Sequence, residues 1–120
     1  MSIRFTTAIC VFMLGISSAD AHAMLDHSTP AVGSTVQKAP RQISLWFTEG
    51  VEPAFSGVTV RNGAGQTVST GKAHLAPGGK TALQVPVGQL PPGIYKVEWH
   101  VLSVDTHKTQ GAYSFTVGGH

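Results

Sequence analysis

Asp105 and His107 are the residues of this 120-residue chain whose types and spacing first suggest chemistry. They flank Thr106, and residues two apart in an extended segment project from the same face. We expect the carboxylate and the imidazole to point the same way if the segment after Leu102 is extended. Such a pair is a usable half-site for a divalent metal ion, although two residues at this spacing also occur often by chance.

His22 completes the site if the chain is cut just before it. Residues 1–21 have the features of a secretory signal: a basic residue near the start, an apolar run and small residues ending at Ala21. Cleavage after Ala21 gives His22 a free α-amine beside its imidazole. Two other cuts remain open, one after Ala19 and one that starts the mature chain at Met24 and destroys the site.

With that terminus free, the three residues provide a donor set typical of a copper site. His22 offers its amine and a ring nitrogen in one chelate ring, Asp105 a carboxylate oxygen and His107 another nitrogen. Three nitrogens and one oxygen suit a tetragonal Cu(II) ion, which heads the divalent affinity order for such ligands. The α-amine titrates near about pH 8, so copper can displace its proton under ordinary conditions.

The composition indicates one small exported domain. Removal of residues 1–21 leaves roughly 100 residues, enough for a single domain that folds alone. Cys10 is the one cysteine and lies within the signal, which excludes a disulfide framework and a thiolate metal site. The formal charge is +2 and the basic residues are scattered, so nucleic acid and anionic membranes are poor candidates for partners. No apolar stretch after the signal approaches the about 18 residues of a membrane-spanning helix.

Short strands separated by glycine and proline are expected to position the candidate ligands. Every second residue is apolar over 43–48 and over 94–102, which predicts that the odd-numbered side chains of these strands face a core. The pattern as a whole is typical of an all-β fold, a Greek-key β-sandwich or barrel of about seven strands. The other expected strands are 25–28, 58–60, 66–69, 81–87 and 112–117.

Several stretches of the mature chain together resemble the CopC-type periplasmic copper-resistance proteins, in order and with matching spacing. The resemblance spans nearly the whole mature chain. The stretches are HAMLDHSTPAVGS (22–34), ISLWFTE (43–49), FSG (55–57), PGIYKVEW (92–99) and VDTH (104–107).

This resemblance implies a cupredoxin-like or immunoglobulin-like Greek-key domain over residues 22–120. It implies that one Cu(II) ion binds per chain, through His22, Asp105 and His107. It also implies that Glu49 lies beside the copper, as a weak axial ligand or just outside the ligand sphere.

Met24 and His27 are the other potential copper contacts near the new terminus. Some members of the family hold Cu(I) in a methionine-rich loop, because soft thioether ligands select Cu(I). The mature chain has Met24 as its single methionine, so we expect the Cu(II)-only kind of protein. For His27 two interpretations remain open: an outer contact of the copper, or an exposed histidine of the first strand.

The function expected from these observations is periplasmic binding of Cu(II) in copper homeostasis and resistance. The protein would be a monomer that sequesters copper or delivers it to a CopD-type inner-membrane transporter, and it would not be an enzyme. One alternative is a copper oxidase or monooxygenase with a histidine brace, although an anionic carboxylate on the copper should hinder reduction. The other is a β-sandwich interaction module that uses no metal.

Overall fold

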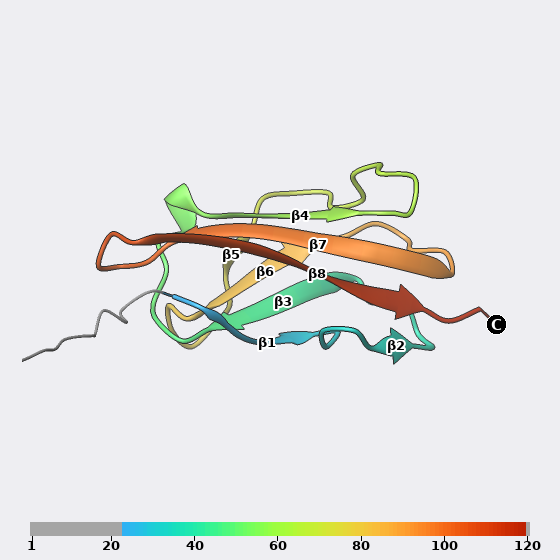
Figure 1. Cartoon of the computed structure of the whole chain (residues 1–120), viewed down its shortest axis with the longest axis horizontal. Coiled ribbons are helices and arrows are strands. Elements are labelled where there is room, and N and C mark those ends of the chain that lie inside the picture. Colours follow the sequence, from blue (N-terminus) through green and yellow to red (C-terminus); the bar gives the residue numbers. More distant parts are fainter. Residues whose placement is uncertain (1–22, 120) are drawn as a thin grey trace, which may run out of the picture.

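The computed structural model describes residues 23–119. The predicted signal peptide, residues 1–21, and the predicted ligand His22 lie outside the described residues. Within 23–119 the chain forms eight strands and one short 3-10 helix, arranged as two stacked sheets (Figure 1). No helix of this part of the chain has the length and hydropathy needed to cross a membrane.

Each sheet has four strands, in the orders β1-β3-β6-β5 and β2-β8-β7-β4. β2 pairs parallel with β8, and the other neighbouring strands pair antiparallel. The chain passes repeatedly between the sheets, because β3 and β6 lie in one and β4 and β7 in the other. The elements are β1 Leu25–Thr29, β2 Thr35–Val36, β3 Gln42–Phe47, η1 Pro53–Phe55, β4 Gly57–Arg61, β5 His74–Leu75, β6 Ala82–Pro86, β7 Gly93–Leu102 and β8 Lys108–Val117.

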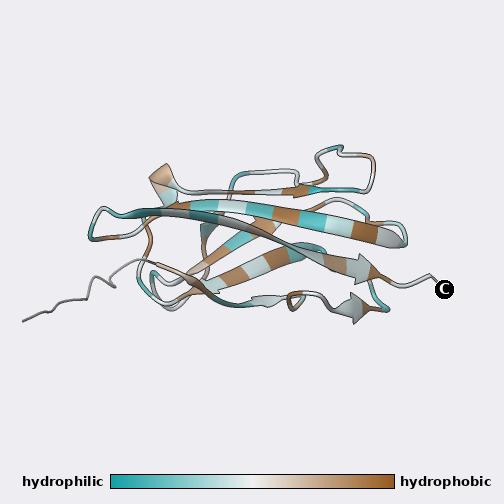
Figure 2. Cartoon of the chain, in the orientation of Figure 1, coloured by the Kyte–Doolittle hydropathy of each residue, from teal (hydrophilic) through white to brown (hydrophobic). Residues whose placement is uncertain are grey.

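The core lies between the two sheets and is built by the alternating faces of the strands. Figure 2 shows this alternation as successive apolar and polar segments along β7. The predicted inward-facing residues of β3 and β7 are all buried, with exposed fractions of 7% or less. They are Ile43, Leu45, Phe47, Tyr95, Val97, Trp99 and Val101.

β7 and β8 form one long hairpin that pairs from Gly93 with Val117 to Leu102 with Lys108. A glycine is required near its middle, because Trp99 lies directly opposite Gly111 in the register. A Cβ atom at Gly111 would meet Cζ2 of Trp99 at 2.6 Å, closer than real Cβ contacts come. The strand expected over 112–117 begins earlier, at Lys108, and its added residues alternate between exposed and half-buried.

Three predictions about the strands are refined. The described residues contain eight strands, because the two-residue strands β2 and β5 are too short to show a period in the sequence. The strand expected over 66–69 is reduced to isolated bridges, Thr67 with Arg61 and Ser69 with Val87. The two sheets stay separate, so the fold is a sandwich and not a closed barrel.

Candidate metal centre

Asp105 and His107 lie in the turn of residues 103–107 that joins β7 to β8. The expectation that this segment is extended is wrong, since Val104 and Asp105 form a turn. The N–H of Thr106 donates to the Ser103 carbonyl at 2.8 Å, and Thr106 has a left-handed φ of 73°. Few β-branched residues adopt this conformation. The turn, and not strand alternation, determines where the two side chains point.

The turn nevertheless brings the two predicted ligands together. Nδ1 of His107 lies 3.3 Å from Oδ1 of Asp105. Metal–ligand bonds of about 2.0–2.1 Å would separate two donors at right angles by about 2.9 Å. The side chains keep exposed fractions of 51% for His107 and 40% for Asp105. The pair thus has nearly the spacing of adjacent donors on one ion, and solvent reaches it.

Ser103 supports both residues from beneath the turn. Its hydroxyl donates to Oδ1 of Asp105 and accepts the backbone N–H of His107 at 3.1 Å. The Ser103 hydroxyl and, to a lesser degree, the His107 imidazole hold the pKa of the Asp105 carboxyl below its ordinary value of 3.8. The carboxylate is therefore ionised at neutral pH, as a metal ligand must be. Nothing in the sequence pattern alone pointed to Ser103.

The N-terminal end of the described chain lies beside this turn, at the left of Figure 1. Oγ1 of Thr109 donates to the Ala23 carbonyl at 2.6 Å. The Met24 backbone donates to Oγ1 of Thr48 at 3.0 Å and accepts the Thr48 N–H at 2.9 Å. Ala23 is fully buried. Ala23, which directly follows His22 in the chain, is thus hydrogen-bonded to Thr109, which lies two residues after His107.

Glu49 belongs to the same end of the sandwich. Its neighbour Thr48 is bonded to Met24, and its other neighbour, Gly50, accepts the backbone N–H of Val104 at 2.9 Å. Glu49 itself is exposed. It therefore lies between the N-terminal anchor and the turn, and its contact with a metal ion stays a prediction.

His27 is an exposed residue of β1 whose ring already has two neighbours. It stacks on Trp46 with ring centroids 4.5 Å apart and an interplanar angle of 8°. Its Nδ1 lies 2.8 Å from Oδ2 of Asp26. This arrangement matches the interpretation of His27 as an exposed first-strand histidine, and a copper contact stays a prediction.

Asp105 and His107 make up only part of a metal site. Over residues 23–119, no group of three or more His, Cys, Asp and Glu side chains is arranged to hold a metal ion. A site with three or more such side chains that includes this pair would therefore need a ligand from outside residues 23–119.

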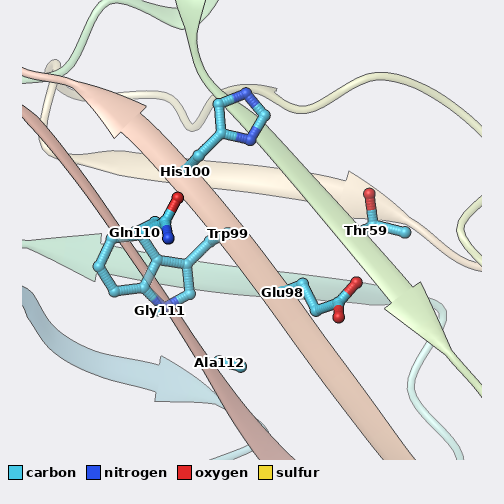
Figure 3. A pocket seen from close by; sticks show the side chains of 7 residues that line it. All are labelled: Thr59, Glu98, Trp99, His100, Gln110, Gly111 and Ala112. Carbon is cyan, nitrogen blue, oxygen red and sulfur yellow. The ribbon is translucent and has the colours of Figure 1, made fainter.

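An open hollow on the outer face of β4, β7 and β8 offers less suitable donors (Figure 3). His100 is exposed there, and its ring would collide with a side chain at Gly57, where a Cβ atom would lie 2.5 Å from Cε1. Glu98 is already paired with Arg61 at 2.9 Å and with Lys96 at 3.6 Å. The hollow therefore offers one histidine and one carboxylate, and the charge of the carboxylate is already neutralised by two cations. Such a pair is a poor metal site.

Comparison with known proteins assigns this chain to a family. Residues 25–118 match the family model of the CopC domain, which covers every strand described above. The chain belongs to the CopC family. Among named relatives, this CopC protein is 42% identical over 117 residues to Protein YobA of Escherichia coli K12, covering 97% of this chain and 94% of that protein. It is 38% identical over 119 residues to copper resistance protein C of Pseudomonas syringae pv. tomato, covering 94% of both chains.

Solved structures of CopC proteins share the two-sheet architecture. CopC from Methylosinus trichosporium OB3b superposes with a TM-score of 0.77 at 32% identity, covering 82% of this chain and 96% of that one. PcoC, a methionine-rich copper resistance protein from Escherichia coli, has a TM-score of 0.71 at 32% identity, covering 81% of this chain and 99% of that one. This CopC protein departs from PcoC in methionine content, because Met24 is the sole methionine among residues 23–119.

Proposed function

We propose that this CopC protein is a periplasmic carrier that binds one Cu(II) ion per chain for copper homeostasis and resistance. The ligands are the amine and imidazole of His22, the Asp105 carboxylate and the His107 imidazole. Glu49 is a weak axial ligand or lies just outside the ligand sphere. Cleavage of the signal after Ala21 creates the amine, so the site forms only in the exported protein.

The observation that carries this proposal is the closeness of Asp105 to His107 beside the anchored residue Ala23. The two side chains are 3.3 Å apart in the turn after β7. Thr109 fixes Ala23 next to that turn. His22 directly precedes Ala23 in the chain, and we propose that its amine and imidazole join the carboxylate and the imidazole of this turn on one ion.

The exposure of the pair favours transfer of copper over permanent storage in the core. Ligands that are 40% and 51% exposed can be replaced one at a time by those of a partner, without unfolding. We propose a CopD-type inner-membrane transporter as the receiving partner and a monomer as the donor. An anionic carboxylate on the ion favours Cu(II), so catalysis by reduced copper is not part of the proposal. Ascorbate-driven production of peroxide by the copper-loaded protein would contradict that point.

The test is the native mass of the protein purified from the exported fraction, with and without one equivalent of Cu(II). We expect a chain that begins at His22 and keeps one copper ion against a competing chelator. A matched control carries an acetyl group on the α-amine of His22, which removes the amine as a ligand, keeps the imidazole and should weaken binding sharply. A chain that begins at Met24, or one that begins at His22 and holds no copper, would overturn the proposal.

A further inference from the structure

Ser103 is the buried polar residue closest to the candidate copper ligands. Its exposed fraction is 0%, and the only other buried polar or charged side chains over residues 23–119 are Ser28 and Ser44. Its backbone forms an isolated bridge with Val51, so both its main chain and its side chain are fixed. Burial of a hydroxyl is unfavourable unless hydrogen bonds replace its water. The contacts of Ser103 therefore need an explanation.

The hydrogen bonds that Ser103 itself makes go to the turn that carries the two ligands. The Ser103 N–H donates to the His107 carbonyl at 2.8 Å, and its carbonyl accepts the Thr106 N–H at 2.8 Å. The hydroxyl accepts the His107 N–H at 3.1 Å and donates its proton to Oδ1 of Asp105. A serine hydroxyl can donate one hydrogen bond, and here the Asp105 carboxylate accepts it.

The turn needs such support, because its backbone includes a residue in an unfavourable conformation. Thr106 has a φ of 73°, a conformation that a threonine rarely adopts and that persists only when its surroundings hold it. Asp105 and His107 are exposed, so packing against the core does not fix them. One buried hydroxyl that bonds the side chain of one ligand and the backbone of the other can fix both.

We propose that Ser103 is the positioning residue of the copper site: it holds Asp105 and His107 at the spacing of adjacent ligands before the ion arrives. The inference rests on the proposed function. Groups that orient metal ligands through hydrogen bonds typically contribute about 10–100-fold to metal affinity. Ser103 does not contact the ion, and its effect is exerted through Asp105 and His107.

The experiment compares four variants of the protein beginning at His22: Ser103→Ala, the equal-volume pair Ser103→Thr and Ser103→Val, and Ser44→Ala. Ser44 is a buried serine control on β3, which accepts a hydrogen bond from Gln84 of the neighbouring strand β6. The readouts are Cu(II) affinity by chelator competition and the electron paramagnetic resonance spectrum of bound Cu(II). We expect Ser103→Ala and Ser103→Val to lose about 10–100-fold in affinity with an altered spectrum. Ser103→Thr and Ser44→Ala should keep the wild-type spectrum.

The outcomes separate this inference from the proposed function. Tight Cu(II) binding by the wild type with equal affinities and spectra for Ser103→Ala or Ser103→Val would overturn the role of Ser103 and leave the copper site standing. Equal losses in Ser103→Thr and Ser103→Val would also overturn it, because these two differ only in the hydroxyl. If Ser103→Ala does not fold, the Thr and Val pair decides the matter. A wild type that binds no copper overturns both proposals.

Discussion

Oγ1 of Thr109 donates a hydrogen bond of 2.6 Å to the carbonyl oxygen of Ala23, 86 positions earlier in the chain. This bond joins the segment just before β1 to the start of β8. Ala23 directly follows the proposed ligand His22, and Thr109 lies two residues after the proposed ligand His107. The bond therefore ties the residue that follows His22 to the strand that follows the turn of Asp105 and His107.

Thr109→Val tests this relationship, because valine keeps the shape and removes the donor. We expect Cu(II) affinity to fall about tenfold or more, since Ala23, the residue after the proposed ligand His22, loses its hydrogen bond to β8. The apo protein should lose about 1 kcal/mol of unfolding free energy, the usual contribution of one hydrogen bond. Chelator competition and urea unfolding measure the two effects. Thr116→Val, further along β8, is the control, and equal copper affinities for the two variants would contradict the prediction.

His107→Ala should separate metal binding from folding. The imidazole is 51% exposed, and exposed substitutions usually change stability by at most about 0.5 kcal/mol. Loss of a ligand should lower Cu(II) affinity by at least about 100-fold. His100→Ala removes an exposed histidine from the outer face of β7 and should leave affinity unchanged. The site assignment fails if both variants bind copper as tightly as the wild type.

Gly111→Ala tests the packing that carries the hairpin. The added Cβ would meet Cζ2 of Trp99 at 2.6 Å, and both residues lie in the middle of their strands. Forcing one extra carbon into a filled site typically costs about 1–3 kcal/mol. We expect a lower midpoint of thermal unfolding, measured by circular dichroism. Gly65→Ala adds the same carbon where no atom lies within 4 Å and tests the backbone cost alone, since its φ is 81°.

Glu98 should make stability depend on pH in the acid range. The Arg61 guanidinium and, less strongly, the Lys96 ammonium hold the pKa of the Glu98 carboxyl below its ordinary value of 4.5. Because the unfolded chain then binds the proton more readily, this stabilisation is complete above the ordinary value and is lost as the pH falls through the lowered pKa. Glu98→Gln should be less stable than the wild type at pH 7 and equal to it in strong acid. Urea unfolding across this range measures the difference, and a gap that does not shrink with acidification would refute the prediction.

The long strands were predictable because their apolar residues alternate with polar ones, which indicates one buried and one exposed face. Alternating residues such as Val97, Trp99 and Val101 can bury one face only as a strand, and they do. β2 and β5 have two residues each, too few for any period, and β2 depends on parallel pairing with β8 across the chain. Such pairings follow from the assembled fold and not from the local sequence.

The residue types of the candidate ligands could be read from the sequence, whereas the turn that carries Asp105 and His107 could not. The residue types of Asp105 and His107 pointed to a metal half-site, and the structure places them 3.3 Å apart. The reason given for their closeness was wrong, because the segment turns at Thr106 where no glycine signals a left-handed backbone. Ser103 was missed for a related reason: the partners of a hydroxyl are decided by the folded turn.

The position of the turn has a consequence for the whole domain. Asp105 and His107 follow β7 in one sheet, whereas Ala23 precedes β1 in the other. An ion bound by these two side chains and by His22, the residue before Ala23, would cross-link the two sheets. The chain has no disulfide to do so, because its single cysteine lies in the predicted signal. Ligands that bind only the folded state add to its stability. Removal of the signal would then control not only copper capture but also how firmly the two layers stay together.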